Sequence, residues 1–254
     1  YEISACLVGS EMCIRDRDST ASIILERIHN LPASKIIFSE VMFDNKNNIS
    51  GELPEHIDFI HNKAIPKFRE WGYDVQILRS EKDYLDLFYH VVTRSKKPER
   101  NGKYAGFLLA GMCAANSQLK IPPIKNFLKT VKKPFIQYIG IATDEQKRLK
   151  KLEGTNKISL LQRYGYTEKM AYDLCKKYDL LSPIYKFAKR GGCWFCPNCS
   201  YKEFARLKKC HTELWNKLML LSNEQNIISS CFKYNKTFLQ IDKKVDEINS
   251  QLSF

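Results

Sequence analysis

The chain has 254 residues, 44% of them hydrophobic, and carries a formal net charge of +13 at pH 7. This length suffices for one domain of ordinary size with a small extension, and for a substantial buried core. No apolar run approaches the roughly 18 residues that a membrane helix requires, so we expect a soluble, cytoplasmic protein without a membrane partner.

The first 17 residues differ in character from the rest. The run Leu7-Val8-Gly9-Ser10-Glu11-Met12-Cys13-Ile14-Arg15-Asp16, followed by an arginine, matches one reading frame of a common tagmentation sequencing adapter. We therefore interpret residues 1–17 as an artefactual leader, adapter-derived at 6–17, and exclude it from the fold prediction. The alternative is a genuine loop in which Arg15 and Arg17 bind phosphate. A signal peptide is not indicated, because the start lacks a cationic region and the apolar run is too broken.

From residue 18 on, helix-like and strand-like segments alternate. Asp18-Ser19-Thr20 suits a helix N-cap and predicts a first helix at 23–31. Apolar runs rich in β-branched residues predict strands at 35–38, 75–78 and 134–141, with a helical stretch at 54–71. This alternation indicates βαβ units and a parallel sheet. Ligands of such sheets bind outside the carboxyl ends of the strands, which here are 39–40, 79–80 and 140–142.

The most specific motif is the run Arg190-Gly191-Gly192-Cys193-Trp194-Phe195-Cys196-Pro197-Asn198-Cys199. Cysteines separated by two residues can direct their sulfurs to one tetrahedral ion, and Cys210 and His211 follow further along. A set of small, buried, apolar cysteines is the alternative. Two helical segments, 213–226 and 238–252, then predict a helical C-terminal cap over 201–254.

Several segments, in this order, resemble the phosphoadenosine phosphosulfate reductase family of the adenine nucleotide alpha hydrolases and ATP pyrophosphatases. They are Phe38-Ser39-Glu40, Leu53-Pro54-Glu55-His56, Gly111-Met112-Cys113 with Lys120 and Pro122, Gly140 to Arg148, the amphipathic run 167–174, Leu181-Ser182-Pro183-Ile184-Tyr185 and the cysteine motif. The resemblance covers most of residues 18–200. It implies an α/β fold with a doubly wound parallel sheet over 18–200, followed by the helical, cysteine-containing extension.

The resemblance also implies a nucleotide site that binds ATP with Mg²⁺. Family members open with a strand and a Ser-Gly-Gly-x-Asp-Ser loop, whose glycines let backbone N–H groups surround the phosphates at a helix N-terminus. This sequence matches only the end of that loop, so we expect the chain as given to bind ATP poorly. The implied nucleotide-binding residues are Asp18, Ser19, Thr20, Ser39, Glu40, Gly140, Asp144, Glu145 and Arg148.

Each of these assignments has a plainer alternative. Asp18 and Ser19 can equally be a helix cap. The carboxylate of Asp144 or Glu145 can support a metal-bound pyrophosphate. Arg148, one helical turn after Asp144, can offer its guanidinium to phosphate oxygens. A simple surface ion pair between Asp144 and Arg148 is the alternative.

Iron–sulfur members of the family carry adjacent cysteines near position 113, which join a later C-x-x-C to hold a [4Fe–4S] cluster. Here Cys113 is followed by Ala114, so one ligand of that pattern is missing. The resemblance therefore implies Cys113, Cys193, Cys196 and Cys199 as metal ligands, with Cys210 as the other candidate for the fourth position. Four thiolates suit either a [4Fe–4S] cluster or zinc. Cys175, in the amphipathic run, is expected to stay outside this group.

Three functions follow as hypotheses. The first is an ATP-dependent enzyme that adenylates a substrate, releases pyrophosphate and prepares sulfur transfer, with an adenine nucleotide and a sulfur donor as partners. The second is a sulfonucleotide reductase, which ranks lower because the chain ends in Gln251-Leu252-Ser253-Phe254, without the family's Glu-Cys-Gly-Leu-His tail. The third is a zinc-containing nucleic-acid-binding module. It would use the charge of +14 outside the first 17 residues, although dispersed lysines also occur as solvated faces.

Overall fold

The computed structural model describes residues 4–8, 17–31, 33–108, 113–188 and 192–251. Within these residues, no helix combines the length and the apolar character needed to span a bilayer. The chain divides into two compact units. Unit 1 comprises residues 1–40, 52–80 and 120–191, and unit 2 comprises residues 41–51, 81–119 and 192–254. The fold is mixed α/β.

Unit 1 contains a five-stranded sheet in the order β5-β2-β1-β6-β7. Its strands are β1 (Ser4–Val8), β2 (Ala33–Glu40), β5 (Asp74–Arg79), β6 (Phe135–Tyr138) and β7 (Lys157–Ile158). Every neighbouring pair is parallel. All five strands therefore end at the same edge of the sheet. This confirms the predicted parallel pairing and the strands expected near 35–38, 75–78 and 134–141.

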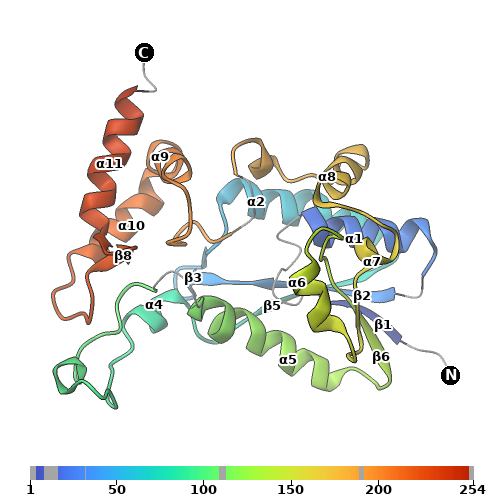
Figure 1. Cartoon of the computed structure of the whole chain (residues 1–254), viewed down its shortest axis with the longest axis horizontal. Helices are drawn as coiled ribbons and strands as arrows, with labels where there is room; N and C mark the ends of the chain where they lie inside the picture. The colour runs from blue at the N-terminus through green and yellow to red at the C-terminus, as the bar shows by residue number, and fades with distance from the viewer. Residues whose placement is uncertain (1–3, 9–16, 32, 109–112, 189–191, 252–254) are drawn as a thin grey trace. The chain divides into compact units, whose positions relative to one another are not determined.

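The helices of unit 1 lie on both faces of this sheet (Figure 1). Ile36 and Phe38 of β2 belong to the main core, whereas Ile37 between them packs on Ile124 of α5. This alternation is the pattern of a strand covered on both faces. The helical segments are α1 (Arg17–Ile28), α2 (Pro54–Phe59), the π-helix η1 (Ile60–Ala64), α3 (Ile65–Glu70), α5 (Ile121–Thr130), α6 (Gln146–Leu149), η4 (Lys150–Leu152), α7 (Leu160–Arg163), α8 (Glu168–Lys177) and η5 (Pro183–Lys186).

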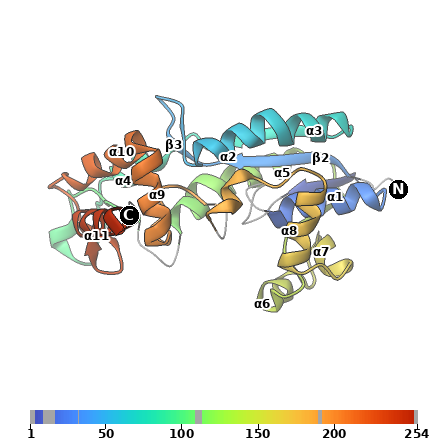
Figure 2. The same ribbon diagram turned by 90° about the horizontal axis from the view of Figure 1, so that it is seen from above.

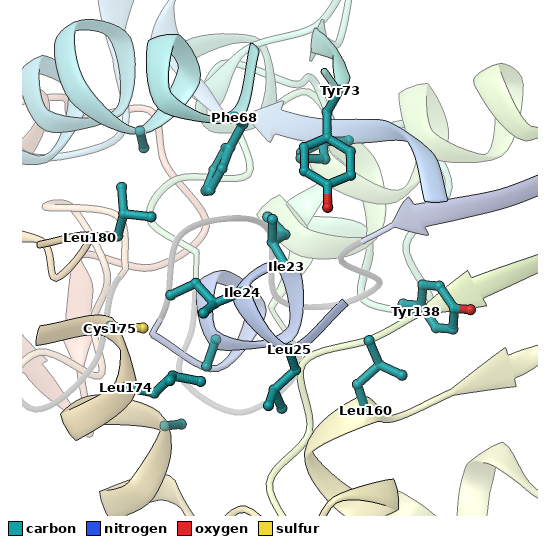
Figure 3. Packing of buried hydrophobic residues seen from close by; sticks show 14 of the residues in the cluster. Ile23, Ile24, Leu25, Phe68, Tyr73, Tyr138, Leu160, Leu174, Cys175 and Leu180 are labelled. Carbon is teal, nitrogen blue, oxygen red and sulfur yellow. The ribbon is translucent and has the colours of Figure 1, made fainter. Parts of the chain in front are cut away.

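Helix α1 is the centre of the main core (Figure 3). All residues from Asp18 to Glu26 are buried. Ile23, Ile24 and Leu25 pack among apolar side chains from the other helices and the sheet, including Phe68, Tyr73, Tyr138, Leu160, Leu174, Cys175 and Leu180. Burial of so much apolar surface holds α1 firmly against the sheet. Cys175 is part of this core, as expected for a small apolar residue.

Two details of the N-terminal region differ from the sequence-based expectation. The leader was excluded from the fold, yet Ser4–Val8 forms β1, which pairs with both β2 and β6 at the centre of the sheet. Helix α1 begins at Arg17, so Asp18-Ser19-Thr20 forms its first turn and does not cap it. The interpretation of residues 6–17 as adapter-derived stays a prediction. Its segment 9–16, which includes Arg15, lies outside the described residues.

Unit 2 is built from three separate stretches of the chain. The hairpin β3 (Met42–Asp44) and β4 (Ile49–Ser50) forms the first, and α4 (Tyr84–Phe88) and η2 (Pro98–Arg100) belong to the second. The π-helix η3 (Asn116–Lys120) closes the second stretch. The third carries α9 (Tyr201–Cys210), α10 (Thr212–Ser222), the hairpin β8 (Cys231–Lys233) and β9 (Lys236–Thr237), and α11 (Phe238–Gln251).

Helices α9, α10 and α11 pack against one another (Figure 2). Their shared core contains the fully buried Phe204, Trp215, Phe232 and Phe238. Near the start of α9, Ser200 and Glu203 form a capping box, in which each side chain accepts from the other residue's backbone N–H. The expected boundary after residue 200 thus differs from the observed one, because residues 192–199 belong to unit 2 with these helices.

Candidate functional site

The carboxyl edge of the unit 1 sheet is the place where the fold favours a ligand. The strand order runs outward in two directions from β1, towards β2 and β5 on one side and towards β6 and β7 on the other. In open parallel sheets, ligands bind outside the carboxyl ends of the strands where the order reverses. That position lies between β1 and β6. Helix α1, the next described element after β1, begins at Arg17.

Gly140 touches the backbone at the start of α1. A Cβ atom added to Gly140 would lie 2.4 Å from the Ser19 nitrogen and 2.6 Å from the Asp18 carbonyl carbon. No side chain fits there, because real Cβ atoms do not approach backbone atoms this closely. Gly140 lies two residues after the end of β6, so this contact brings the segment that follows β6 against the first turn of α1. The structure thus brings together three of the predicted nucleotide-binding residues, Gly140, Asp18 and Ser19.

The first turn of α1 carries buried polar side chains. Asp18, Ser19, Thr20 and Ser22 are all nearly inaccessible. The Ser22 hydroxyl donates to the Asp18 carbonyl at 3.0 Å. The guanidinium of Arg17 lies 3.5 Å from an Asp18 carboxylate oxygen and also forms an ion pair with Glu168. A negative side chain in the first turn of a helix is favourable by itself, so this arrangement fits both a structural and a nucleotide-related role.

A hollow of about 440 Å³ opens beside Arg17. Its wall combines aromatic and charged side chains, namely Arg17, Glu168, Tyr172, Tyr185, Lys186, Phe187 and Ala188. The Tyr185 hydroxyl accepts a hydrogen bond of 2.9 Å from the Arg17 backbone N–H, and the Arg17 guanidinium stands 5.9 Å from the centre of the Tyr185 ring. The segment Leu181 to Tyr185 was singled out in the sequence, but no ligand role was predicted for its tyrosine.

Ser39 and Glu40, at the end of β2, both have protein partners. The Ser39 hydroxyl donates to the Lys120 carbonyl at 3.0 Å. The buried carboxylate of Glu40 accepts from the Arg79 Nε at 2.8 Å and forms an ion pair with the same guanidinium. Arg79 ends β5, the strand next to β2, so this pair joins two strand ends at the carboxyl edge. The contact places a positive charge beside the predicted nucleotide-binding acid Glu40.

Asp144, Glu145 and Arg148 follow β6, as predicted, but the ion pair among them differs from the Asp144–Arg148 pair that was the alternative to a nucleotide-binding role. Arg148 donates to both carboxylate oxygens of Glu145, at 2.6 and 2.8 Å. The Asp144 carboxylate instead accepts from the Glu168 backbone N–H at 3.3 Å. The Arg148 side chain is about a quarter exposed, which leaves it accessible to an anionic group. The arrangement offers one guanidinium and two carboxylates near the end of β6.

In unit 2, residues 193–199 form what we call the cysteine turn. The Cys196 N–H donates to the Cys193 carbonyl and the Cys199 N–H to the Cys196 carbonyl, both at 3.0 Å. A hydrogen bond that the Cys199 thiol donates to the Cys196 side chain, followed by burial and the nearby charges of Cys196, Glu203 and Cys193, raises the pKa of Cys199 well above its usual range. Cys199 is therefore a thiol at neutral pH, and its hydrogen bond shows that two of the three thiols already touch.

Aromatic side chains hold the cysteine turn in place. The Trp194 N–H donates to the Gly51 carbonyl at 3.0 Å, and its indole N–H donates to the Ser50 carbonyl at 2.9 Å. The Phe43 ring packs on both Trp194 and Phe195. Gly51 lies so close to Phe195 that an added Cβ would stand 2.9 Å from its ring. The hairpin β3–β4 thus fixes the turn by backbone bonds and by close packing.

The predicted four-cysteine metal centre is not assembled among the described residues, which include all four cysteines. No group of three or more His, Cys, Asp or Glu side chains in these residues has an arrangement suited to a metal ion. Cys113 is exposed, and its sulfur accepts from the Asn116 N–H at 3.4 Å. Cys210 ends α9, whereas the cysteine turn precedes its start, a separation of about 14 Å along the helix. Among the described residues, Cys210 does not join the cysteine turn in a group suited to a metal ion.

The residues of the turn nevertheless fit a thiolate-binding metal in their chemistry. Three sulfurs at two-residue spacing can supply three ligands to zinc or to an iron–sulfur cluster. Binding would first require loss of the proton that Cys199 retains. The structure brings Cys193, Cys196 and Cys199 into one turn and does not bring Cys113 into a metal-binding group with them. Residues 109–112, next to Cys113, lie outside the description.

Lys233 is a residue that the sequence analysis did not single out. From β8, its ammonium donates to the Pro197 carbonyl at 2.8 Å and to the Cys199 carbonyl at 2.7 Å. A lysine 34 residues away from Cys199 thus closes the end of the cysteine turn. In the sequence, Lys233 is a lysine in a short apolar run, and this pattern does not indicate a contact with the cysteine turn.

Tyr84 was missed as well. Its side chain is fully buried, and burial raises the pKa of its hydroxyl far above the usual range, with further contributions from the nearby Cys193 and Cys196. Its ring centre lies 4.1 Å from that of Phe195. Tyr84 therefore places a neutral phenol beside the thiols of the cysteine turn.

No family model matches the chain, and neither a curated protein nor a solved structure matches it.

Proposed function

We propose that the chain is an ATP-dependent enzyme of the adenine nucleotide alpha hydrolase type, with a doubly wound sheet. It adenylates an acceptor and releases pyrophosphate, in preparation for sulfur transfer. In this reaction a nucleophilic atom of the acceptor attacks the α-phosphorus of ATP. The bond from the α-phosphorus to the bridging oxygen breaks, and pyrophosphate leaves with that oxygen and its electron pair.

The observation that carries the proposal is the contact of Gly140 with Asp18 and Ser19. A glycine after β6 lets the first turn of α1 lie directly at the point where the strand order reverses. The N-terminus of a twelve-residue helix favours negative charge, and its first N–H groups suit phosphate oxygens. Near β6, Arg148 can bind a phosphate oxygen, while the acidic Asp144 and Glu145 can support Mg²⁺.

The experiment is a comparison of two chains. In the repaired chain, residues 1–17 are replaced by a strand that ends in Ser-Gly-Gly-Lys, because β1 pairs with β2 and β6 and a strand must be retained. We expect tight binding of ATP with Mg²⁺ to the repaired chain and weak binding to the original, measured by calorimetry. Tight binding to the original chain, without any gain on repair, would contradict both the adapter interpretation and the missing phosphate loop.

Turnover tests the chemistry separately. We expect the repaired chain to convert ATP and an acceptor into the adenylated acceptor and pyrophosphate. Asp144→Asn should slow this release strongly, whereas Asp173→Asn, which removes an exposed carboxylate of α8, should not. Formation of ADP and phosphate in place of pyrophosphate and the adenylated acceptor would overturn the assigned reaction.

A thiolate-bound metal is proposed as the second component. The metal would be held by Cys193, Cys196 and Cys199. Zinc would stabilise the cysteine turn, whereas an iron–sulfur cluster would supply a redox or sulfur-handling group. Anaerobically purified protein should contain iron with visible absorption, or about one equivalent of zinc. Cys193→Ser should abolish that content, and Cys175→Ser should leave it unchanged. Metal-free protein that retains full activity would remove the metal from the proposal.

A further inference from the structure

Three lysines of unit 2 gather around one tyrosine. The ring centre of Tyr201, at the start of α9, lies 5.8 Å from the ammonium of Lys233 and 5.8 Å from that of Lys236. The pKa of Lys244, on α11, is raised mainly by Glu247 and to a smaller extent by the nearby Tyr201. The ring of Tyr234 stands 5.5 Å from the Lys233 ammonium. We call these three lysines and two tyrosines the lysine–tyrosine patch.

The positive charge of this patch is only partly neutralised. Lys244 forms an ion pair with Glu247 at 2.7 Å. Lys233 donates to two backbone carbonyls, which are uncharged. In the part of the chain that the structure describes, neither Lys233 nor Lys236 forms an ion pair with a carboxylate. The Lys236 ammonium therefore remains available to an anion that approaches the two rings, and the Lys233 ammonium adds its positive charge and its one N–H not used by the two carbonyls.

Tyr234 is held outward by the hairpin. It is 71% exposed, and its φ of 41° and that of Asn235, 61°, define a two-residue turn with left-handed backbone. Such turns favour asparagine or glycine at both positions, and a large aromatic residue there is disfavoured. The hairpin thus presents a tyrosine ring to solvent at a position where local structure would prefer a smaller residue. Stacking of a ligand on the ring would explain why a tyrosine occupies this turn position.

We propose that the lysine–tyrosine patch binds a single-stranded nucleic acid. Exposed aromatic rings stack on unpaired bases, and lysines beside them pair with the phosphates of the same strand. The ring of Tyr234 would stack on a base, while Lys236 and Lys233 would contact the backbone. An acidic peptide would satisfy the ammonium groups but offers no base for the exposed ring. This inference goes beyond the proposed ATP chemistry and depends on neither nucleotide nor metal.

The test measures binding of a fluorescent twelve-nucleotide oligothymidylate to the full chain by anisotropy, without ATP. We expect Tyr234→Asn to weaken binding by about tenfold, because stacking on one base contributes of the order of one factor of ten or more. Asparagine suits the left-handed turn, so this change should not unfold the hairpin. Tyr234→Trp should retain the affinity. Tyr89→Asn, which removes another exposed ring of unit 2, should leave binding unchanged.

Lys236→Ala should weaken binding several-fold and reduce the slope of log affinity against log salt by about 0.7. Lys209→Ala removes the same charge from the far end of α9 and is the matched control, with a much smaller effect expected. Equal effects of the two lysine changes, or unchanged binding of Tyr234→Asn, would overturn the proposal in favour of diffuse attraction. The proposal would also be overturned if Tyr234→Asn weakened the binding of heparin or polyglutamate, which carry no bases, as much as it weakens the binding of the oligothymidylate. Failure of pyrophosphate release would leave this result untouched, so the two proposals fail independently.

Discussion

Gly140 and Ser19 lie in direct backbone contact, although 121 positions separate them in the sequence. The contact fixes the first turn of α1 against the end of β6, at the edge where the parallel strands end. Both residues belong to unit 1 and sit beside its main core. The geometry of the candidate nucleotide site is therefore tied to the main core of that unit.

Gly140→Ala tests this contact. The added methyl group would lie 2.4 Å from the Ser19 nitrogen, so the backbone of either β6 or α1 must move. We expect the free energy of unfolding to fall by about 3 kcal/mol, measured by denaturant unfolding. Gly192→Ala is the control, because an added Cβ at Gly192 meets no atom within 4 Å. An unchanged stability of the Gly140 variant would contradict the observed contact.

Arg148→Ala separates a functional role from a structural one. Its ion pair with Glu145 is partly exposed, and pairs of this kind contribute at most about 1 kcal/mol. We therefore expect a nearly unchanged melting temperature. In the repaired chain, pyrophosphate release should slow by about tenfold, because a charge-assisted bond to phosphate is lost. Lys147→Ala, which removes the neighbouring exposed charge, serves as the control. Lower stability with undiminished turnover would instead assign Arg148 a structural role.

Lys233→Met tests the closure of the cysteine turn. Methionine keeps much of the lysine's length but leaves the Pro197 and Cys199 carbonyls without this donor. We expect a loss of about 1 to 3 kcal/mol in stability. Cys196 and Cys199 should also react faster with a thiol reagent, since the turn is less restrained. Lys236→Met, which lacks these carbonyl contacts, should change neither quantity. Equal reactivity in all three proteins would show that Lys233 does not restrain the turn.

The raised pKa of Cys199 predicts a dependence on alkaline pH. A cysteine in an unfolded chain loses its proton near pH 8.5, whereas the folded state keeps the Cys199 proton to higher pH. The resulting stabilisation is fully present below about pH 8.5 and is lost as the pH rises through the folded-state pKa. The melting temperature of metal-free protein should therefore fall between pH 8 and 10, and fall less in Cys199→Ser. Identical pH profiles of the two proteins would contradict the assignment.

The sequence predicted local structure better than it predicted long-range contacts. The strands β2, β5 and β6 and the helices α10 and α11 follow from β-branched runs and amphipathic spacing. Strand β1 was missed because its segment was excluded by its resemblance to an adapter, not by its side chains. The start of α1 was placed too late, since Asp18 and Ser19 suit a cap as well as a first helical turn.

The contacts that define the candidate sites come from distant parts of the chain. The Glu40 and Arg79 pair joins neighbouring strands, and Lys233 reaches Cys199 from another hairpin. The two residues of each contact lie more than 30 positions apart in the sequence, so neither helical nor strand periodicity could indicate that they meet. The cysteine motif was recognisable because its three cysteines share one turn. Its predicted partner, Cys113, depended on a tertiary arrangement that the described residues do not contain.

The interrupted course of unit 2 has a consequence during synthesis. Its hairpin β3–β4 leaves the ribosome about 140 residues before the cysteine turn that completes it. At typical rates of translation, this delay is roughly seven to thirty seconds. During that time Phe43 and Tyr84 lack Trp194 and Phe195, the rings on which they pack in the finished structure. A nascent chain of this protein therefore exposes these aromatic rings for seconds before the residues that cover them have been synthesised.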